Sequence, residues 1–410
     1  MPCSTWRRRA PLACAVAFAA IAALPARADQ FATVVSFSGT DGANPQGALL
    51  DVGGTLYGTT GNGGSANGGT VFSLNPTNGA LATVASFNAF NESGPTSGLV
   101  DVNGTLYGTT DGGRSNFGTA FSLNPTSGAI TTLASFNYTN SYANGSFPRA
   151  GLIDVNGTLY GTTTFGAAGA AGTVFSLNPT TGAFNTLVSF TGSNGANPYA
   201  GLVSVGTTLY GAAVNAGGAG NGTVFSLNPT SGALTTLVSF NYTDGAGPYA
   251  ALIDVNGTLF GTTIGGGSRG AGTVFSLNPT TGALTTLVSF AGTNGADPVA
   301  SLIDVGGMLY GTTEFGGGAN DGTVFSLNPT TGALTTLVSF TGSNGADPNG
   351  ALIDVGDTLY GTTGNGGSAA DGTVFSFTLP GAANVPEPAS IALLGAGLAA
   401  LTLARGRPRG

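Results

Sequence analysis

The chain lacks histidine and lysine, since all ten of its basic residues are arginine. Its two cysteines, Cys3 and Cys14, lie near the N-terminus, and only 7% of the 410 residues are charged, against roughly 25% in an average soluble chain. These absences exclude a histidine base, a lysine Schiff base, a thiol nucleophile beyond residue 28 and a zinc site of the usual Cys/His type. A nucleic-acid-binding surface is excluded as well, because residues 29–388 hold 3 arginines against 18 acidic residues, a net charge of −15.

Glycine and apolar residues take the place of the missing charge. The chain contains 72 glycines and 20 prolines, and 41% of its residues are hydrophobic. This is too hydrophobic for a disordered chain, so the sequence predicts an ordered, turn-rich fold.

Residues 1–28 have the three parts of a secretory signal peptide. A basic segment, Trp6-Arg7-Arg8-Arg9, precedes an apolar run over residues 12–24, and Ala26-Arg27-Ala28 fits the pattern of small residues at a cleavage site. The apolar run is shorter than the roughly 20 residues of a membrane-spanning helix. The segment therefore predicts export by the Sec machinery, with the mature chain starting at Asp29.

The C-terminus carries a second targeting segment. A linker over 381–388 ends in a Pro-Glu-Pro motif, and residues 389–410 form a hydrophobic helix with a basic tail. The residues of this motif and tail are Pro386, Glu387, Pro388, Arg405, Arg407 and Arg409. They resemble the PEP-CTERM sorting signal, which implies processing by an exosortase in a Gram-negative bacterium. We expect transient anchoring in the inner membrane and then a place at the cell surface or in the extracellular matrix. A plain C-terminal anchor after an incidental proline-rich linker is the alternative.

Seven copies of one unit fill the middle of the chain. The phrase Leu-Tyr-Gly-Thr-Thr, with minor changes, has its leucines at Leu56, Leu106, Leu159, Leu209, Leu259, Leu309 and Leu359. A second phrase, Gly-Thr-Val-Phe-Ser-Leu, recurs at spacings of 49, 54, 50, 50, 50 and 50 residues. A fixed period near 50 indicates a solenoid, a propeller or another repeat array.

Each unit contains four short β-rich runs, here called A to D. In the unit that starts at Gly201 they cover 201–205, 208–212, 223–228 and 234–240. Asn-Gly pairs, typical of tight hairpins, join A to B in three units, and Asn-Pro-Thr-Thr-Gly or a near variant joins C to D. The pattern predicts an all-β fold, a seven-bladed β-propeller of four-stranded antiparallel blades over residues 29–380.

The ends of the repeat region predict how the ring closes. Residues 31–37 align with the D run at 234–240, and the last unit stops at 377 after its C run. One spare strand at the start and one missing at the end complete a seventh blade only if the ends meet. We therefore expect 31–37 to pair with 372–377, and an open β-stack is the alternative.

Over residues 31–378 these phrases resemble the Gloeo/Verruco tandem-repeat family, exported bacterial proteins with a choice of C-terminal anchors. The resemblance implies a propeller-like surface protein. It supplies no activity, so no functional residue is transferred from it.

The loops of one face are the best candidates for binding. In a four-stranded blade the D–A and B–C loops share one face, and here they vary among units while the C–D turns are nearly identical. The candidate binding residues are Arg114, Arg149, Tyr199, Tyr249, Arg269 and Glu314. They suit an extracellular polysaccharide or a surface protein. Neutral drift of exposed loops is the alternative.

A carboxylate recurs in run A of six units. The residues are Asp51, Asp101, Asp154, Asp254, Asp304 and Asp354. Since the A strands of a propeller are innermost, these side chains are weak candidates for a ring that binds Ca²⁺, which takes six to eight oxygen ligands. The alternative is that each accepts hydrogen bonds from its own hairpin. We predict no other cofactor.

Together these features predict an exported, non-enzymatic propeller with a structural or adhesive role. The alternative is a propeller enzyme that acts on polysaccharide, a lyase or a hydrolase. Such an enzyme needs a pair of nearby carboxylates, but Glu92 and Glu314 lie in different units. Carboxylates that depart from the repeat and gather at the channel mouth would favour the enzyme.

Overall fold

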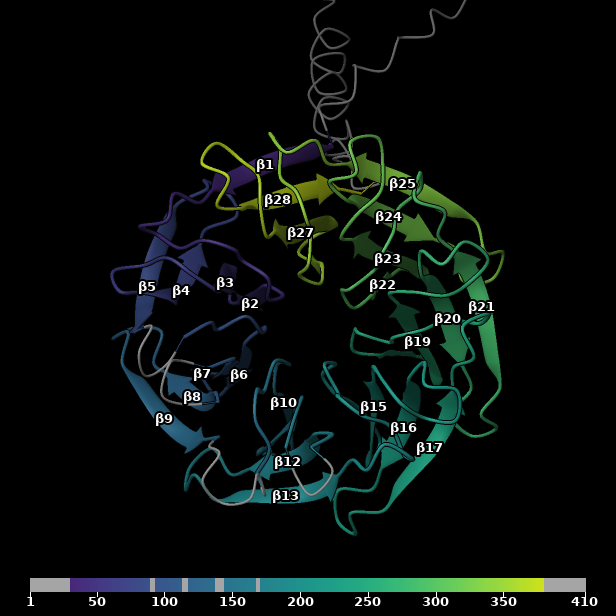
Figure 1. Cartoon of the computed structure of the whole chain (residues 1–410). Coiled ribbons are helices and arrows are strands. Elements are labelled where there is room, and N and C mark those ends of the chain that lie inside the picture. Colours follow the sequence, from purple (N-terminus) through teal and green to yellow (C-terminus); the bar gives the residue numbers. More distant parts are fainter. Residues whose placement is uncertain (1–29, 89–92, 113–116, 137–143, 167–169, 380–410) are drawn as a thin grey trace, which may run out of the picture.

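The computed structural model describes residues 30–88, 93–112, 117–136, 144–166 and 170–379. In these ranges 28 strands form seven four-stranded antiparallel sheets. Figure 1 shows the sheets arranged as blades around a central axis, in chain order. The prediction of a seven-bladed β-propeller is confirmed.

The blades are numbered in chain order, and in blades 1 to 6 the strands run A to D from the axis outward. Blades 1 and 2 comprise β2 (Leu50–Val52), β3 (Thr55–Thr60), β4 (Asn67–Leu74) and β5 (Leu81–Asn88), then β6 (Val100–Val102), β7 (Thr105–Thr110), β8 (Thr119–Leu123) and β9 (Ile130–Ser135). Blades 3 and 4 comprise β10 (Ile153–Val155), β11 (Thr158–Thr163), β12 (Thr173–Leu177) and β13 (Phe184–Ser189), then β14 (Val203–Val205), β15 (Thr208–Ala213), β16 (Thr223–Leu227) and β17 (Leu234–Ser239). Blades 5 and 6 comprise β18 (Ile253–Val255), β19 (Thr258–Thr263), β20 (Thr273–Leu277) and β21 (Leu284–Ser289), then β22 (Ile303–Val305), β23 (Met308–Thr313), β24 (Thr323–Leu327) and β25 (Leu334–Ser339). Blade 7 comprises β26 (Ile353–Asp354), β27 (Thr358–Thr363), β28 (Thr373–Thr378) and, from the other end of the chain, β1 (Phe31–Ser36).

Strand β1 closes the ring by pairing with β28. The two strands are antiparallel, and Val35 lies directly opposite Val374. The pairing is extended at one end by the amide of Phe37, which donates to the carbonyl of Gly372 at 3.0 Å. Figure 1 shows this contact between the first strand, in purple, and the last, in yellow. The predicted closure is therefore confirmed, and an open stack is wrong.

Phenylalanine pairs hold adjacent blades together. In each contact the phenylalanine at or just after the D strand of one blade packs against the phenylalanine of the next C strand, with ring centroids 5.0 to 5.3 Å apart. The pair Phe37–Phe72 makes this contact between blade 7 and blade 1. The glycine of Leu-Tyr-Gly-Thr-Thr leaves room for this layer, because a Cβ at Gly161 would lie 2.6 Å from Cζ of Phe175.

Buried threonine pairs join the B strand to the C strand. In blade 5 the hydroxyl oxygens of Thr263 and Thr273 are 2.8 Å apart, and five other blades repeat the pair. Blade 4 is the exception because Ala213 replaces the B-strand threonine. The hydroxyl of Thr223 is consequently buried without a partner.

The two targeting segments lie outside the described residues, as does the Pro-Glu-Pro motif. Among the residues that the structure does describe, no helix is long and apolar enough to cross a membrane.

Candidate functional site: a cavity at one mouth of the channel

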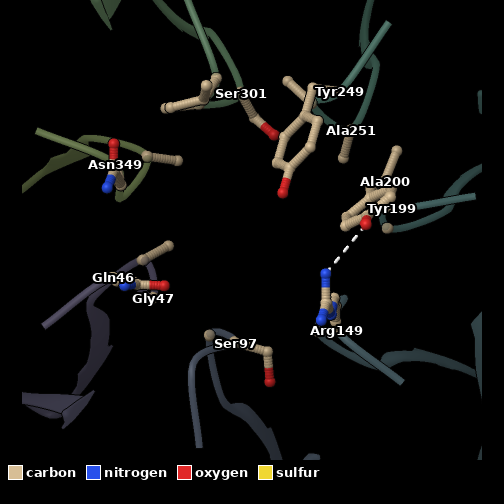
Figure 2. Close-up of a pocket in the computed structure, with 18 of the residues that line it drawn as sticks. Gln46, Gly47, Ser97, Arg149, Tyr199, Ala200, Tyr249, Ala251, Ser301 and Asn349 are labelled. Atoms are coloured by element: carbon tan, nitrogen blue, oxygen red, sulfur yellow. Dashed lines mark hydrogen bonds between the residues drawn. The ribbon is translucent and has the colours of Figure 1, made fainter. Parts of the chain in front are cut away.

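The D–A and B–C loops surround a cavity of about 710 Å³ at one end of the central channel. Every blade contributes the residue that follows its loop proline. These seven residues, here called the post-proline ring, are Gln46, Thr96, Arg149, Tyr199, Tyr249, Val299 and Asn349. Figure 2 shows five of them around the open centre, with the hydroxyl of Tyr249 directed into it.

A contact common to all blades holds the post-proline ring in place. Each loop proline packs against the glycine that begins Gly-Thr-Val-Phe in the preceding blade, and a Cβ at Gly172 would lie 2.7 Å from Cδ of Pro198. That glycine also has a φ of 99°, in the region that favours glycine. The backbone is thus the same in each blade, while the side chain after the proline is free to differ.

One wall of the cavity combines a cation with stacked aromatic rings. The guanidinium of Arg149 donates from Nε to Oδ1 of Asp111 at 2.9 Å and from a terminal nitrogen to the hydroxyl of Tyr199 at 2.9 Å. Its Cζ lies 5.1 Å from the centre of the Tyr199 ring, and the rings of Tyr199 and Tyr249 stack with centroids 4.7 Å apart. Burial raises the pKa of Tyr249 to about 12, so its hydroxyl stays protonated and able to donate.

A cluster of phenylalanine rings packs next to Arg149. Phe147 adopts a φ of 57°, a left-handed conformation that costs a bulky residue about 1–3 kcal/mol. Its ring packs edge-on against Phe117 and Phe165, with centroids 5.4 and 5.9 Å away, and lies 5.7 Å from Cζ of Arg149. These contacts compensate for the strained backbone and position the guanidinium.

Another part of the cavity wall is acidic. Glu314 follows the B strand of blade 6, and its amide donates to the carbonyl of Asp297 at 3.0 Å. Burial, together with the nearby charges of Asp347 and Asp297, raises the pKa of the Glu314 carboxyl, and burial raises the pKa of Asp297. The side-chain oxygen of Asn349 is buried on this side and has no hydrogen-bond partner.

The structure brings together four of the six predicted binding residues: Arg149, Tyr199, Tyr249 and Glu314 line the cavity. Arg269 is exposed on its B–C loop and does not line it. Arg114, like Glu92, lies outside the described residues.

The sequence analysis missed Gln46, Asn349 and Asp111 as candidates, although all three line the cavity. The signal for the first two is present in the sequence, because Gln46 and Asn349 directly follow a loop proline, as Tyr199 and Tyr249 do. Extending that position to every blade identifies the whole post-proline ring.

The A-strand aspartates are weak candidates for a shared Ca²⁺ ring, and this stays a prediction. Within the described ranges, no three acidic side chains lie close enough together to hold a metal ion. Instead, Asp51, Asp101 and Asp254 each accept a hydrogen bond from the glycine amide of their own hairpin, at 2.8, 2.9 and 3.0 Å. The structure supports the turn-forming role for these three.

Comparison with known families accounts for nearly the whole repeat region. The model of the Gloeobacter/Verrucomicrobia repeat matches residues 19–144, 138–321 and 209–386. The chain belongs to this repeat family. The model of the PEP-CTERM protein-sorting motif matches residues 384–407. The chain is therefore an exported propeller with an envelope-sorting signal, and this signal implies processing by an exosortase. Among curated proteins no match was found.

Solved structures resemble the repeat protein in fold. An oligogalacturonate lyase from Vibrio parahaemolyticus is 10% identical, with a TM-score of 0.55, and the match covers 86% of this chain and 94% of the other. An oligogalacturonate lyase in complex with manganese is also 10% identical, with a TM-score of 0.52 and coverage of 83% and 90%. At such identity the likeness shows the propeller fold alone.

Proposed function

We propose that this exported propeller is a non-enzymatic adhesive protein of the cell envelope or extracellular matrix that binds carbohydrate in its central cavity. The observation that carries the proposal is the post-proline ring. Six different residue types occupy its seven positions, whereas the adjoining glycine and proline are the same in every blade. The propeller thus presents a specific set of side chains on a uniform scaffold.

The chemistry of the cavity suits a sugar. Its volume of about 710 Å³ lies within the roughly 300–1,000 Å³ of small-ligand sites, so it accommodates a short glycan segment. Stacked tyrosines supply a flat apolar surface, and Gln46, Asn349 and Ser97 supply polar groups. Sugars need both, because they combine apolar ring faces with hydroxyl groups.

The sorting signal fits this role. We infer that the C-terminal helix holds the protein transiently in the inner membrane of a Gram-negative bacterium until exosortase processing. The propeller then reaches the surface or the matrix, where polysaccharide is abundant.

A glycan array tests the proposal. We expect the exported protein to bind a defined set of glycans and Tyr249→Ala to lose that binding, because the change removes the end of the aromatic stack. Thr280→Ala is the matched control, since Thr280 is exposed in the C–D turn of the same blade, on the opposite face. Binding that survives Tyr249→Ala but is lost in Thr280→Ala would place the ligand on the face of the C–D turns, opposite the cavity, and would contradict the proposal.

A polysaccharide lyase or hydrolase is the second candidate function. It is favoured by the carboxylates of Asp111, Asp297 and Glu314, which depart from the repeat and line the channel mouth. The likeness to oligogalacturonate lyases adds only the fold. Prolonged incubation with soluble polysaccharides distinguishes the candidates. New reducing ends, or the ultraviolet absorbance of unsaturated ends, that disappear in Glu314→Gln would establish the enzyme.

A further inference from the structure

The charged groups of the cavity differ in whether they have a partner of opposite charge. Three carboxylates and one guanidinium line it, those of Asp111, Asp297, Glu314 and Arg149. Arg149 is already paired with Asp111 at 2.9 Å and bonded to Tyr199. Among the described residues, no side chain forms a salt bridge with Glu314 or Asp297. The cavity therefore has excess negative charge, concentrated in blade 6.

The polar atoms near this charge accept hydrogen bonds. The carboxylates of Glu314 and Asp297, which line the cavity, are acceptors when ionised. A ligand that donates hydrogen bonds to these carboxylates therefore gains affinity, because a hydrogen bond to a charged group is stronger than one between neutral groups. Burial and the charges of Asp347 and Asp297 raise the pKa of the Glu314 carboxyl, in keeping with its lack of a salt-bridge partner among the described residues.

The tyrosine stack lies within electrostatic reach of these acceptors. Tyr199 comes from blade 4, between Arg149 of blade 3 and Tyr249 of blade 5. Tyr249 is thus the end of the stack on the side of blade 6, and the Glu314 charge contributes to the raised pKa of its hydroxyl. A ligand that packs on Tyr249 can therefore direct a polar substituent toward Glu314.

We propose that the cavity selects glycans that carry a free primary ammonium group, such as deacetylated hexosamines, with the ammonium facing Glu314 and Asp297 and the sugar ring against Tyr249. This inference rests on the proposed carbohydrate-binding function. An ammonium supplies three donors and a positive charge, and it is also attracted to the face of an aromatic ring. The net charge of −15 over residues 29–388 attracts such a ligand. A carboxylated sugar has to compete with Asp111 for Arg149, so it is disfavoured.

Titration calorimetry with three soluble oligomers of equal length tests the inference. The probes are oligomers of glucosamine, of N-acetylglucosamine and of galacturonic acid, at a pH where the amine is protonated. We expect the glucosamine oligomer to bind at least about tenfold more tightly than its acetylated counterpart, since a hydrogen bond to a charged group contributes about 1.5–3 kcal/mol. Affinity should fall with added salt.

Two variants assign the effect to blade 6. Glu314→Gln should reduce glucosamine affinity by about tenfold, and it should reduce affinity for the acetylated oligomer much less, so that the preference for the amine falls. Asp321→Asn is the matched control, because Asp321 belongs to the same B–C loop but does not line the cavity. The control should bind like the unmodified protein, and thermal unfolding establishes that each variant is folded.

The outcomes separate this inference from the function on which it rests. Equal binding of the glucosamine and acetylated oligomers would overturn the inference and leave carbohydrate binding in place. Tighter binding of the galacturonate oligomer, lost in Arg149→Gln, would overturn it in favour of an acidic sugar. If a full glycan array, including these three oligomers, shows no binding, the proposed function itself fails.

Discussion

A disulfide across the closing strands measures how much the ring depends on its closure. Ala32 on β1 lies directly opposite Ser376 on β28, and both side chains are small and at least partly exposed. Opposed residues of antiparallel strands have Cα atoms about 4.5 or 5.5 Å apart, within the range for a disulfide. Both natural cysteines, Cys3 and Cys14, lie before residue 29, so in a chain that starts at Asp29 the combination of Ala32→Cys and Ser376→Cys has one possible pairing.

The expected gain follows from the length of chain that the bond encloses. The two positions are about 340 residues apart, and the loss of unfolded-state entropy for such a loop corresponds to about 6 kcal/mol. The equivalent pair within blade 1, Ser73 opposite Ala82, has the same exposure but encloses only about 10 residues. Its disulfide should contribute about 3 kcal/mol. The closing bond should therefore stabilise the propeller by about 3 kcal/mol more than the internal bond.

Urea denaturation of both double variants, oxidised and reduced, measures these differences. Thiol titration first establishes that each bond has formed. If the closing pair fails to oxidise under conditions where the internal pair does, the strands are not opposed in solution. If both bonds give the same gain, closure of the ring does not limit unfolding, and the reasoning is refuted.

Three further predictions follow from the core, the cavity and the tail. Ala213→Thr should raise the free energy of unfolding in urea by about 1 kcal/mol, because it supplies a partner for the buried Thr223 hydroxyl; unchanged or lower stability would contradict the assignment. In the folded protein the pKa values of Asp297 and Glu314 are raised above their ordinary 3.8 and 4.5. The stability that these two groups contribute is therefore present below the ordinary values and is lost as the pH rises through the raised values. The double replacement by Asn and Gln should flatten this part of the stability–pH curve, and a curve unchanged from the parent would show that neither group titrates abnormally. Truncation after Asn384 should release an intact propeller into the medium, whereas continued surface association of the truncated protein in cell fractionation would refute the sorting role.

Local sequence was enough to predict the blades. Asn-Gly and Asn-Pro-Thr-Thr-Gly turns set the hairpins, and the β-rich runs between them became strands close to their predicted bounds. The A strands are shorter than predicted. For example, β14 covers Val203–Val205, whereas the predicted strand began at residue 201. Residues 201 and 202 belong instead to the wall of the cavity.

Ring closure was also contained in the sequence, because residues 31–37 repeat the D-strand pattern and the last unit lacks that strand. Pairing and packing at the closure are local copies of those within the chain. The pairing of β1 with β28, for example, has the same register as the pairing of β17 with β16 in blade 4, with Val35 opposite Val374 as Val238 is opposite Val224.

The site depended on tertiary structure. Arg149, Tyr199 and Tyr249 follow one another at intervals of 50 residues, and only the packing of blades 3, 4 and 5 around one axis brings them into a single stack. The same geometry separates residues that the repeat pattern grouped, since Arg269 is exposed and three of the A-strand aspartates bond to their own hairpins. A repeat pattern determines which residues occupy equivalent places in each blade. Which side chains meet is determined by how the blades curve around the axis and by which loop positions face it.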